Sequence, residues 1–129
     1  MRQRRVSWWI VLAVAVAVLN VSSCGFKRKL VSITVTPDAV TLGGPGLQVQ
    51  YKAIGHYVHP PDARDITNTA TWESAAPQVI TIDSTGLATS GDVCGQNVTI
   101  TASAHSDPHD DSSGIVIGSA TVNVCQGGN

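Results

Sequence analysis

The sequence predicts an all-β fold, a sandwich of two antiparallel sheets with about seven strands. Three observations support this prediction. From Leu30 onward, apolar and polar residues alternate in short runs, which is typical of strands with one buried face and one exposed face. Clusters rich in Gly, Pro, Asp and Ser separate the runs, and no run after residue 23 has the spacing of an amphipathic helix. Short strands at such intervals over about 100 residues are typical of a sandwich domain.

The alternating runs give five of the expected strands, in chain order. They are residues 31–36, 47–53, 80–82, 98–103 and 120–124. The segments between them, residues 36–38, 43–46, 59–62, 83–86 and 107–108, each contain Gly or Pro. Both residues interrupt regular structure and favour turns. We therefore expect one domain at residues 31–125, followed by a short tail at residues 126–129.

The first 23 residues have the pattern of an export signal. Arg2, Arg4 and Arg5 precede an uninterrupted apolar run of twelve residues, 8–19. As a helix, this run would be about 18 Å long, well short of the roughly 30 Å hydrocarbon core of a bilayer. A basic start, a short apolar core and then small residues predict a signal peptide at residues 1–23 that is removed during export.

The residues that follow this run resemble a known processing motif. Val21-Ser22-Ser23-Cys24 is similar to the lipobox of bacterial lipoproteins. The resemblance implies cleavage before Cys24 and attachment of a diacylglyceryl group to its thiol. It thus implies a lipid anchor in the cell envelope, and we expect the outer membrane or cell surface rather than the inner membrane. The alternative is an ordinary secretory signal with a chance cysteine beside its cleavage site.

Charge is unevenly placed in the expected mature chain. Removal of residues 1–23 would leave 106 residues with five cations and nine carboxylates. Three of the cations, residues 27–29, directly follow Cys24, and each would be attracted to anionic headgroups by about 1 kcal/mol. A merely soluble tether is the alternative interpretation. Beyond Leu30 there are two cations against nine carboxylates, which argues against nucleic acid as a partner.

Four ordered matches connect the rest of the chain with a known family. They are Ile33-x-Val35-x-Pro37, Asp65-Ile66-Thr67, Trp72-x-Ser74 and Gly86-Leu87. In this order and spacing they resemble the bacterial immunoglobulin-like group 2 domain, over nearly all of residues 31–124. The resemblance implies an immunoglobulin-like sandwich of seven strands with a structural, adhesive or partner-binding role, its partner an unknown envelope protein or glycan. It implies no enzyme activity and no cofactor. The alternative is a generic β-domain rich in Thr and Val.

Two cysteines depart from the family pattern. In the seven-strand family fold, Cys94 would lie between the fifth and sixth strands, and Cys125 would follow the seventh. In an immunoglobulin-like arrangement these positions fall at the same end of the sandwich, and an exported chain occupies an oxidising compartment. The resemblance therefore predicts a Cys94–Cys125 disulfide. Two free thiols or a metal site are the alternatives, and the pair lacks the C-x-x-C spacing of common zinc sites.

Histidines and carboxylates gather in two segments, His56–Asp62 and His105–Asp111. Imidazole and carboxylate groups bind divalent ions, and the family fold would place both segments at one end. The candidate ligands are His59, His105, Asp107 and His109. A metal- or small-ligand-binding lipoprotein is therefore the alternative function. The simpler interpretation is a solvated acidic turn, so we expect no dedicated metal site.

Two further expectations concern chemistry and reach. The chain contains no nucleophile elbow, phosphate-binding loop or metalloprotease helix motif, so we do not expect an enzyme.

The expected tether at residues 24–30 leaves six residues after Cys24, which extend over about 20 Å at most. The domain would remain close to its membrane. In the family fold, the end that carries the His- and Asp-containing loops would face the membrane.

Overall fold

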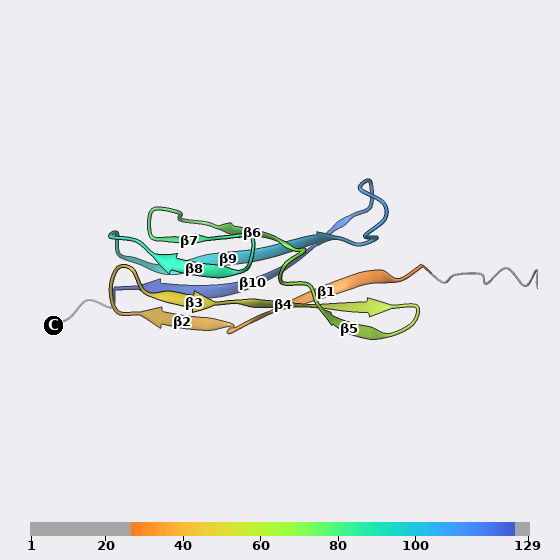
Figure 1. Ribbon diagram of the computed structural model, residues 1–129, viewed down its shortest axis with the longest axis horizontal. Helices are drawn as coiled ribbons and strands as arrows, with labels where there is room; N and C mark the ends of the chain where they lie inside the picture. Colours follow the sequence, from red (N-terminus) through yellow and green to blue (C-terminus); the bar gives the residue numbers. More distant parts are fainter. Residues whose placement is uncertain (1–26, 126–129) are drawn as a thin grey trace, which may run out of the picture.

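The computed structural model describes residues 27–125, which form ten strands and no helix (Figure 1). Their bounds are β1 Lys29–Thr36, β2 Ala39–Leu42, β3 Gln48–Gln50, β4 Lys52–Val58, β5 Asp62–Asp65, β6 Thr71–Ser74, β7 Ile80–Ile82, β8 Leu87–Ser90, β9 Gly95–His105 and β10 Ile115–Val124. The predicted all-β class is confirmed. No part of residues 27–125 forms a helix suited to crossing a membrane. The expected signal peptide, Cys24 and the tail at residues 126–129 lie outside the described residues.

The strands form three small sheets rather than two. Their orders are β1-β4-β5, β2-β10-β9-β6 and β3-β8-β7. Only Tyr51 separates β3 from β4, so the chain passes directly from the third sheet to the first. Pro37 and Asp38 carry the chain from β1 to a different sheet without reversing its direction (Figure 1). As a result β2 runs parallel to β10, whereas we expected antiparallel pairing throughout.

Two features account for much of the difference between ten strands and the expected seven. The alternating run at residues 47–53 is divided at Tyr51, because β3 pairs with β8 up to Gln50 and β4 pairs with β1 from Lys52 onward. In addition, the segment after His59 was expected to be a loop, but Asp62–Asp65 forms β5 against β4. This four-residue strand buries no side chain, so it lacks the alternation by which strands are recognised.

The core is built from the apolar positions of the alternating runs. β9 buries Val98, Ile100 and Ala102, and their Thr neighbours are only half-buried. Tyr51 and Trp72 lie in the same core, with ring centroids 6.3 Å apart. Residues from all three sheets belong to one buried cluster, so the sheets stabilise one another as a single domain.

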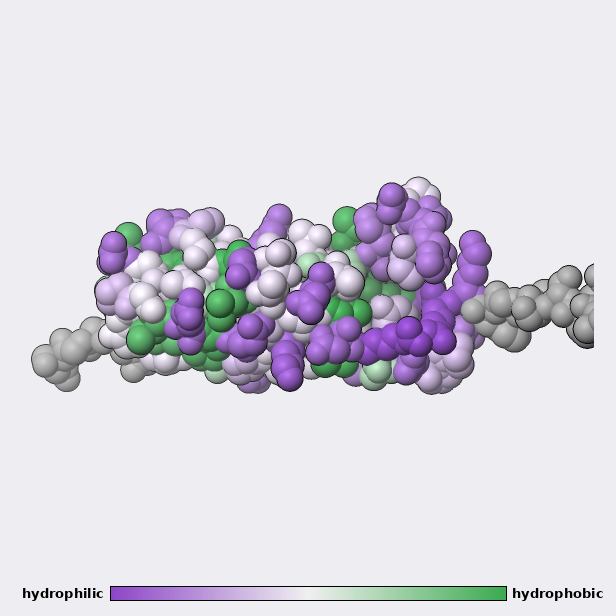
Figure 2. Space-filling model, viewed as in Figure 1, coloured by the Kyte–Doolittle hydropathy of each residue, from purple (hydrophilic) through white to green (hydrophobic). Residues whose placement is uncertain are grey.

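The two ends of the elongated body carry different groups (Figure 1). We call residues 27–30, 57–64 and 105–115 the proximal end, because β1 begins there. Residues 43–47, 91–95 and 124–125 form the distal end. The N–H of Leu30 donates to the Ser106 carbonyl oxygen at 2.7 Å, so β1 begins beside the connection between β9 and β10. Figure 2 shows strongly hydrophilic side chains gathered at the proximal end.

Candidate functional site

The proximal end contains a cavity of about 390 Å³. It is lined by Lys27, Arg28, Tyr57, Arg64, Asp107, Pro108 and His109. β4 and β5 contribute Tyr57 and Arg64, which lie near each other because Tyr57 pairs with Asp62 in the hairpin. The segment before β1 and the connection between β9 and β10 supply the others. The cavity thus joins three parts of the chain that are distant in sequence.

The charges of this cavity favour an anion over a metal cation. Three guanidinium or ammonium groups line it, against the single carboxylate of Asp107. Asp62 lies beside it, with its Oδ2 at 2.7 Å from the Nε of Arg64 and 3.9 Å from Nη1 of Arg28. The hydrogen bond from Arg64 is the main cause that holds the pKa of Asp62 below its ordinary value. These ion pairs are solvent-exposed and contribute little to stability.

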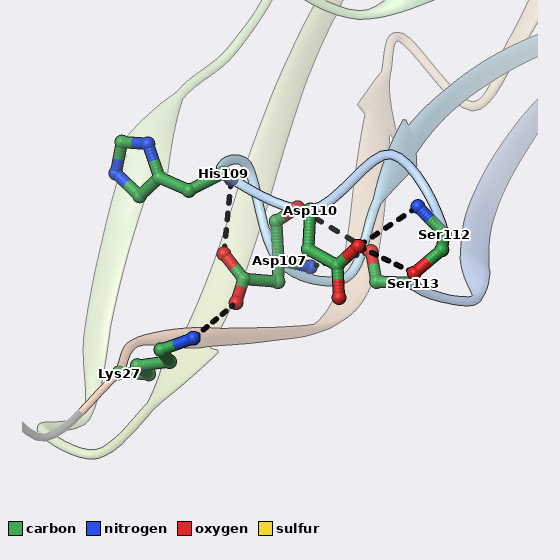
Figure 3. A network of polar contacts seen from close by, with 6 residues as sticks. All are labelled: Lys27, Asp107, His109, Asp110, Ser112 and Ser113. Carbon is green, nitrogen blue, oxygen red and sulfur yellow. Dashed lines mark hydrogen bonds and ion pairs between the residues drawn. The ribbon is translucent and has the colours of Figure 1, made fainter.

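The acidic loop between β9 and β10 is organised by its own hydrogen bonds (Figure 3). Asp107 Oδ1 accepts from the N–H of His109 at 2.9 Å, and its Oδ2 lies 3.9 Å from Lys27 Nζ. Asp110 Oδ1 accepts from both the hydroxyl and the N–H of Ser112, and these bonds hold the pKa of Asp110 below its ordinary value. The carboxylates therefore stabilise local turns.

The candidate metal ligands do not converge. His56, expected in a loop, lies within β4, and its Nε2 is 3.0 Å from the hydroxyl of Thr34 on β1. His105 lies in β9, with Nδ1 3.4 Å from the carbonyl oxygen of Ser113. The ring of His109 points away from the carboxylates of Asp107 and Asp110 (Figure 3). Within residues 27–125, no three His, Cys, Asp or Glu residues, including His59, form a group that could hold a metal ion.

The cavity includes residues that the sequence did not single out as a site. Lys27 and Arg28 were assigned only to the tether, and Tyr57 and Arg64 were not considered as ligands. The sequence contained a weak indication that Arg64 belongs to a binding site, because Arg64 is one of only two cations beyond Leu30. Its position opposite the tether, however, depends on the β4–β5 hairpin, which the sequence pattern did not reveal.

The two cysteines are neighbours at the distal end. Val124 of β10 is paired with Gly95 of β9, so Cys125 and Cys94 occupy the next positions of the two chains. Both are free thiols in this structure, Cys94 exposed and Cys125 half-buried. A hydrogen bond with Cys94 is the main cause that raises the pKa of the Cys125 thiol, and burial adds to it. The disulfide remains a prediction, and this adjacency is what it requires.

Comparisons with known proteins add no assignment. No protein-family model matches the chain. No curated protein matches it either. The similarities to the bacterial immunoglobulin-like group 2 domain and to the lipobox therefore stand on the residues that carry them.

Proposed function

We propose that this protein is a lipid-anchored module of the bacterial cell envelope, with an immunoglobulin-like fold and a structural, adhesive or partner-binding role. The observation that carries the proposal is that the folded domain begins only a few residues along the sequence from the lipobox-like Cys24. β1 begins at Lys29, five positions after Cys24. A segment of this length reaches about 17 Å when extended. A domain held so closely acts at the membrane surface, on partners within the envelope.

The order of the strands supports an immunoglobulin-like sandwich. In that fold, strands A, B, E and D form one sheet and strands C, F and G form the other. The continuous β3–β4 segment joins β1-β4 to β3-β8-β7, which gives the order A-B-E-D. The order β6-β9-β10 corresponds to C-F-G. With β3 and β4 counted as one strand, and β2 and β5 as additions, seven strands remain.

The environments of the histidines favour a role without catalysis. His56 contacts a threonine hydroxyl and His105 contacts a backbone carbonyl oxygen. A general base normally lies within hydrogen-bond reach of a nucleophile and is oriented by a third group. Neither of these histidines has such a pair of partners in the hydrogen bonds of residues 27–125. A binding or structural role therefore fits these residues better than catalysis.

The anchor is tested with Cys24→Ala in the full chain, expressed in a bacterial host. We expect loss of labelled fatty acid from the protein and its loss from the membrane fraction. Gly114→Ala is the control, because its added methyl group meets no atom within 4 Å and the lipobox stays intact. Membrane association of Cys24→Ala equal to that of wild type would refute the anchor. Chemical crosslinking in intact cells, followed by mass spectrometry, would identify the envelope partner.

The cavity at the proximal end favours a second candidate function. Its three cations and the phenol of Tyr57 are suited to a small anionic ligand. In this alternative the protein is a lipoprotein that binds a small ligand or a metal through residues 56–62 and 105–111. Calorimetric titration of the detergent-solubilised protein with phosphate, zinc and calcium tests it. Heats that fit one site per chain would support it, and Arg64→Ala should then abolish the phosphate signal. Absence of stoichiometric binding would eliminate it.

A further inference from the structure

One edge of the sheet β2-β10-β9-β6 is covered over only half its length. β2 pairs with Thr121–Val124 of β10. Within residues 27–125, the preceding segment Ile115–Ala120 has β9 as its only strand partner. The first half of β10 is therefore an open edge, at the proximal end of the domain.

The backbone of this open edge is available for pairing. The N–H of Thr121 donates to Asp38 on the β2 side of the strand, at 2.8 Å. Because a strand repeats every two residues, the N–H and carbonyl groups of Ile117 and Ser119 point to that same side. β2 begins only at Ala39, opposite Thr121, and does not reach them. These groups can form a second ladder with another strand.

The side chains of the open edge also suit a strand partner. Ile115 and Ile117 are 63% and 64% exposed. No charged residue and no proline occur from Ile115 to Val124. Proteins usually protect exposed strand edges with lysine, proline or a bulge in the edge strand. The segment Ile115–Ser119 carries none of these protections, and its register with β9 is regular.

The open edge is held in place from behind. At Gly118, a Cβ atom would lie 2.5 Å from the carbonyl oxygen of Ile33 on β1. β1 therefore passes directly behind β10 at this point, and only glycine permits the approach. Because both β9 and β1 restrain the strand, little conformational entropy is lost when a partner strand pairs with it.

We propose that this edge pairs with the same edge of a second copy of the chain, β10 against β10 in antiparallel orientation. β2 limits the overlap, because it occupies the edge from Thr121 onward. Pairing of Ile115–Ser119 with itself places the twofold axis at Ile117. Ile117 then faces its own copy, and Ile115 faces Ser119. The outward-pointing backbone groups of the two copies meet, and no like charges stand opposite each other.

The position of the edge favours a second copy as the occupant, and this step rests on the proposed lipid anchor. Leu30 bonds to Ser106, and Ser106 bonds to Gly114, so β1 begins beside the start of β10. Antiparallel pairing over Ile115–Ser119 thus brings the two proximal ends together. Both tethers then leave from the same region and reach one membrane. Confinement to that membrane raises the effective concentration of each copy for the other.

The interface is small, so the dimer should depend on this confinement. Five residues per copy bury far less than the roughly 1,200 Å² of a stable interface. We therefore expect dimers in membranes and monomers after extraction into dilute detergent. The proposal commits to a second copy, and an extended segment of another protein is the competing outcome.

Disulfide crosslinking tests the register. In Ile117→Cys, the new cysteines of the two copies would be a facing pair with Cα atoms about 5.5 Å apart, within the roughly 4.4–6.8 Å range of disulfides. Oxidation of intact membranes that contain the full-length variant should give a product of twice the monomer mass. Ser119→Cys is the matched control on the same edge. Its cysteines would lie roughly 14 Å apart, since four residues of strand separate them, so it should remain monomeric.

Each outcome decides the proposal. Oxidation of the wild-type protein measures how much crosslinked product forms through the native Cys94 and Cys125. Equal crosslinking of Ile117→Cys and Ser119→Cys, or a product of another mass, would overturn it. So would a monomeric Ile117→Cys in the membrane fraction. If fractionation instead finds the protein outside the membrane, the anchor has failed, and the same oxidation is carried out on purified variant at about 1 mM, a concentration comparable to that of a short tether. A dimer there supports the strand pairing, and a monomer refutes it.

Discussion

The close approach of β1 to β10 gives the sharpest test of the fold. In Gly118→Ala, the added methyl group would lie 2.5 Å from the carbonyl oxygen of Ile33 and 2.9 Å from its Cβ and Cγ2. The nearest atom belongs to the backbone, so rotation of a side chain does not relieve the clash. Overpacking of this kind destabilises a core by about 1–3 kcal/mol. Because the backbone must move here, we expect Gly118→Ala to lower the free energy of unfolding by an amount in the upper part of that range.

The corresponding change in melting temperature is easily measured. For a domain of about 100 residues, each kcal/mol lowers Tm by about 4–8 °C, so Gly118→Ala should lose about 10–20 °C in thermal unfolding followed by circular dichroism. Gly114→Ala is the matched control, since a Cβ at Gly114 meets no atom within 4 Å. It should change stability by less than about 0.5 kcal/mol. Equal Tm values for the two variants would refute the passage of β1 behind β10 at Gly118.

Three further predictions concern the distal end, the carboxylates and the core. If the Cys94–Cys125 disulfide forms, it closes a loop of about 30 residues, and Cys125→Ser should lower the free energy of unfolding by about 3–4 kcal/mol. The exported protein is denatured and treated with an alkylating agent. Reaction at both thiols would contradict the bond. The hydroxyl and N–H of Thr67 hold the pKa of Asp65 below its ordinary value. A lowered folded-state pKa adds stability above the unfolded value of about 3.9, and this is lost as the pH falls through the lower folded value. Asp65→Asn should therefore reduce the fall in Tm on acidification from about pH 5 to about pH 2, and an unchanged fall would exclude this carboxylate as a cause. Trp72 Nε1 donates to the carbonyl oxygen of Thr67 at 2.8 Å. Trp72→Phe should leave that buried oxygen without its donor and lower the midpoint of urea unfolding by the equivalent of about 1–3 kcal/mol. An unchanged midpoint would show that the bond contributes nothing to stability.

The parts of the fold that the sequence predicted are those in which alternation and burial coincide. Along β9 the side chains at every second position face the core, so Val98, Ile100 and Ala102 carry the pattern directly. The break at Tyr51 has no such signal. There the N–H of Tyr51 donates to Gly86, and the N–H of Ala53 donates to the Thr67 hydroxyl. The chain changes its partner strand between these two residues, and alternation does not record which strand is the partner.

The candidate site was less predictable for a related reason. Composition identified the His- and Asp-containing segments, and both contribute to the proximal end. It did not indicate that β4 extends to Val58, which places His56 on the sheet beside Thr34 and not in a loop. Nor did it indicate that Lys27 and Arg28 lie opposite Arg64. Such convergence is decided by strand pairing between distant segments, and a single sequence specifies these partners only weakly.

The pairing of charges at the proximal end bears on how the proposed anchor would orient the domain. If this end faces the membrane, anionic headgroups would repel the carboxylates of the acidic loop. In the structure, however, Asp107 faces Lys27, and Asp62 faces both Arg28 and Arg64. Asp107 and Asp62 thus offset two of the three cations at the cavity before any membrane is present. Exposed ion pairs contribute at most about 1 kcal/mol each. An anionic membrane surface can therefore replace the carboxylates as partners of the cations, and the net gain in binding free energy is small. The lipid at Cys24 and the open edge of β10, rather than net charge, would then fix the orientation of the domain at the membrane.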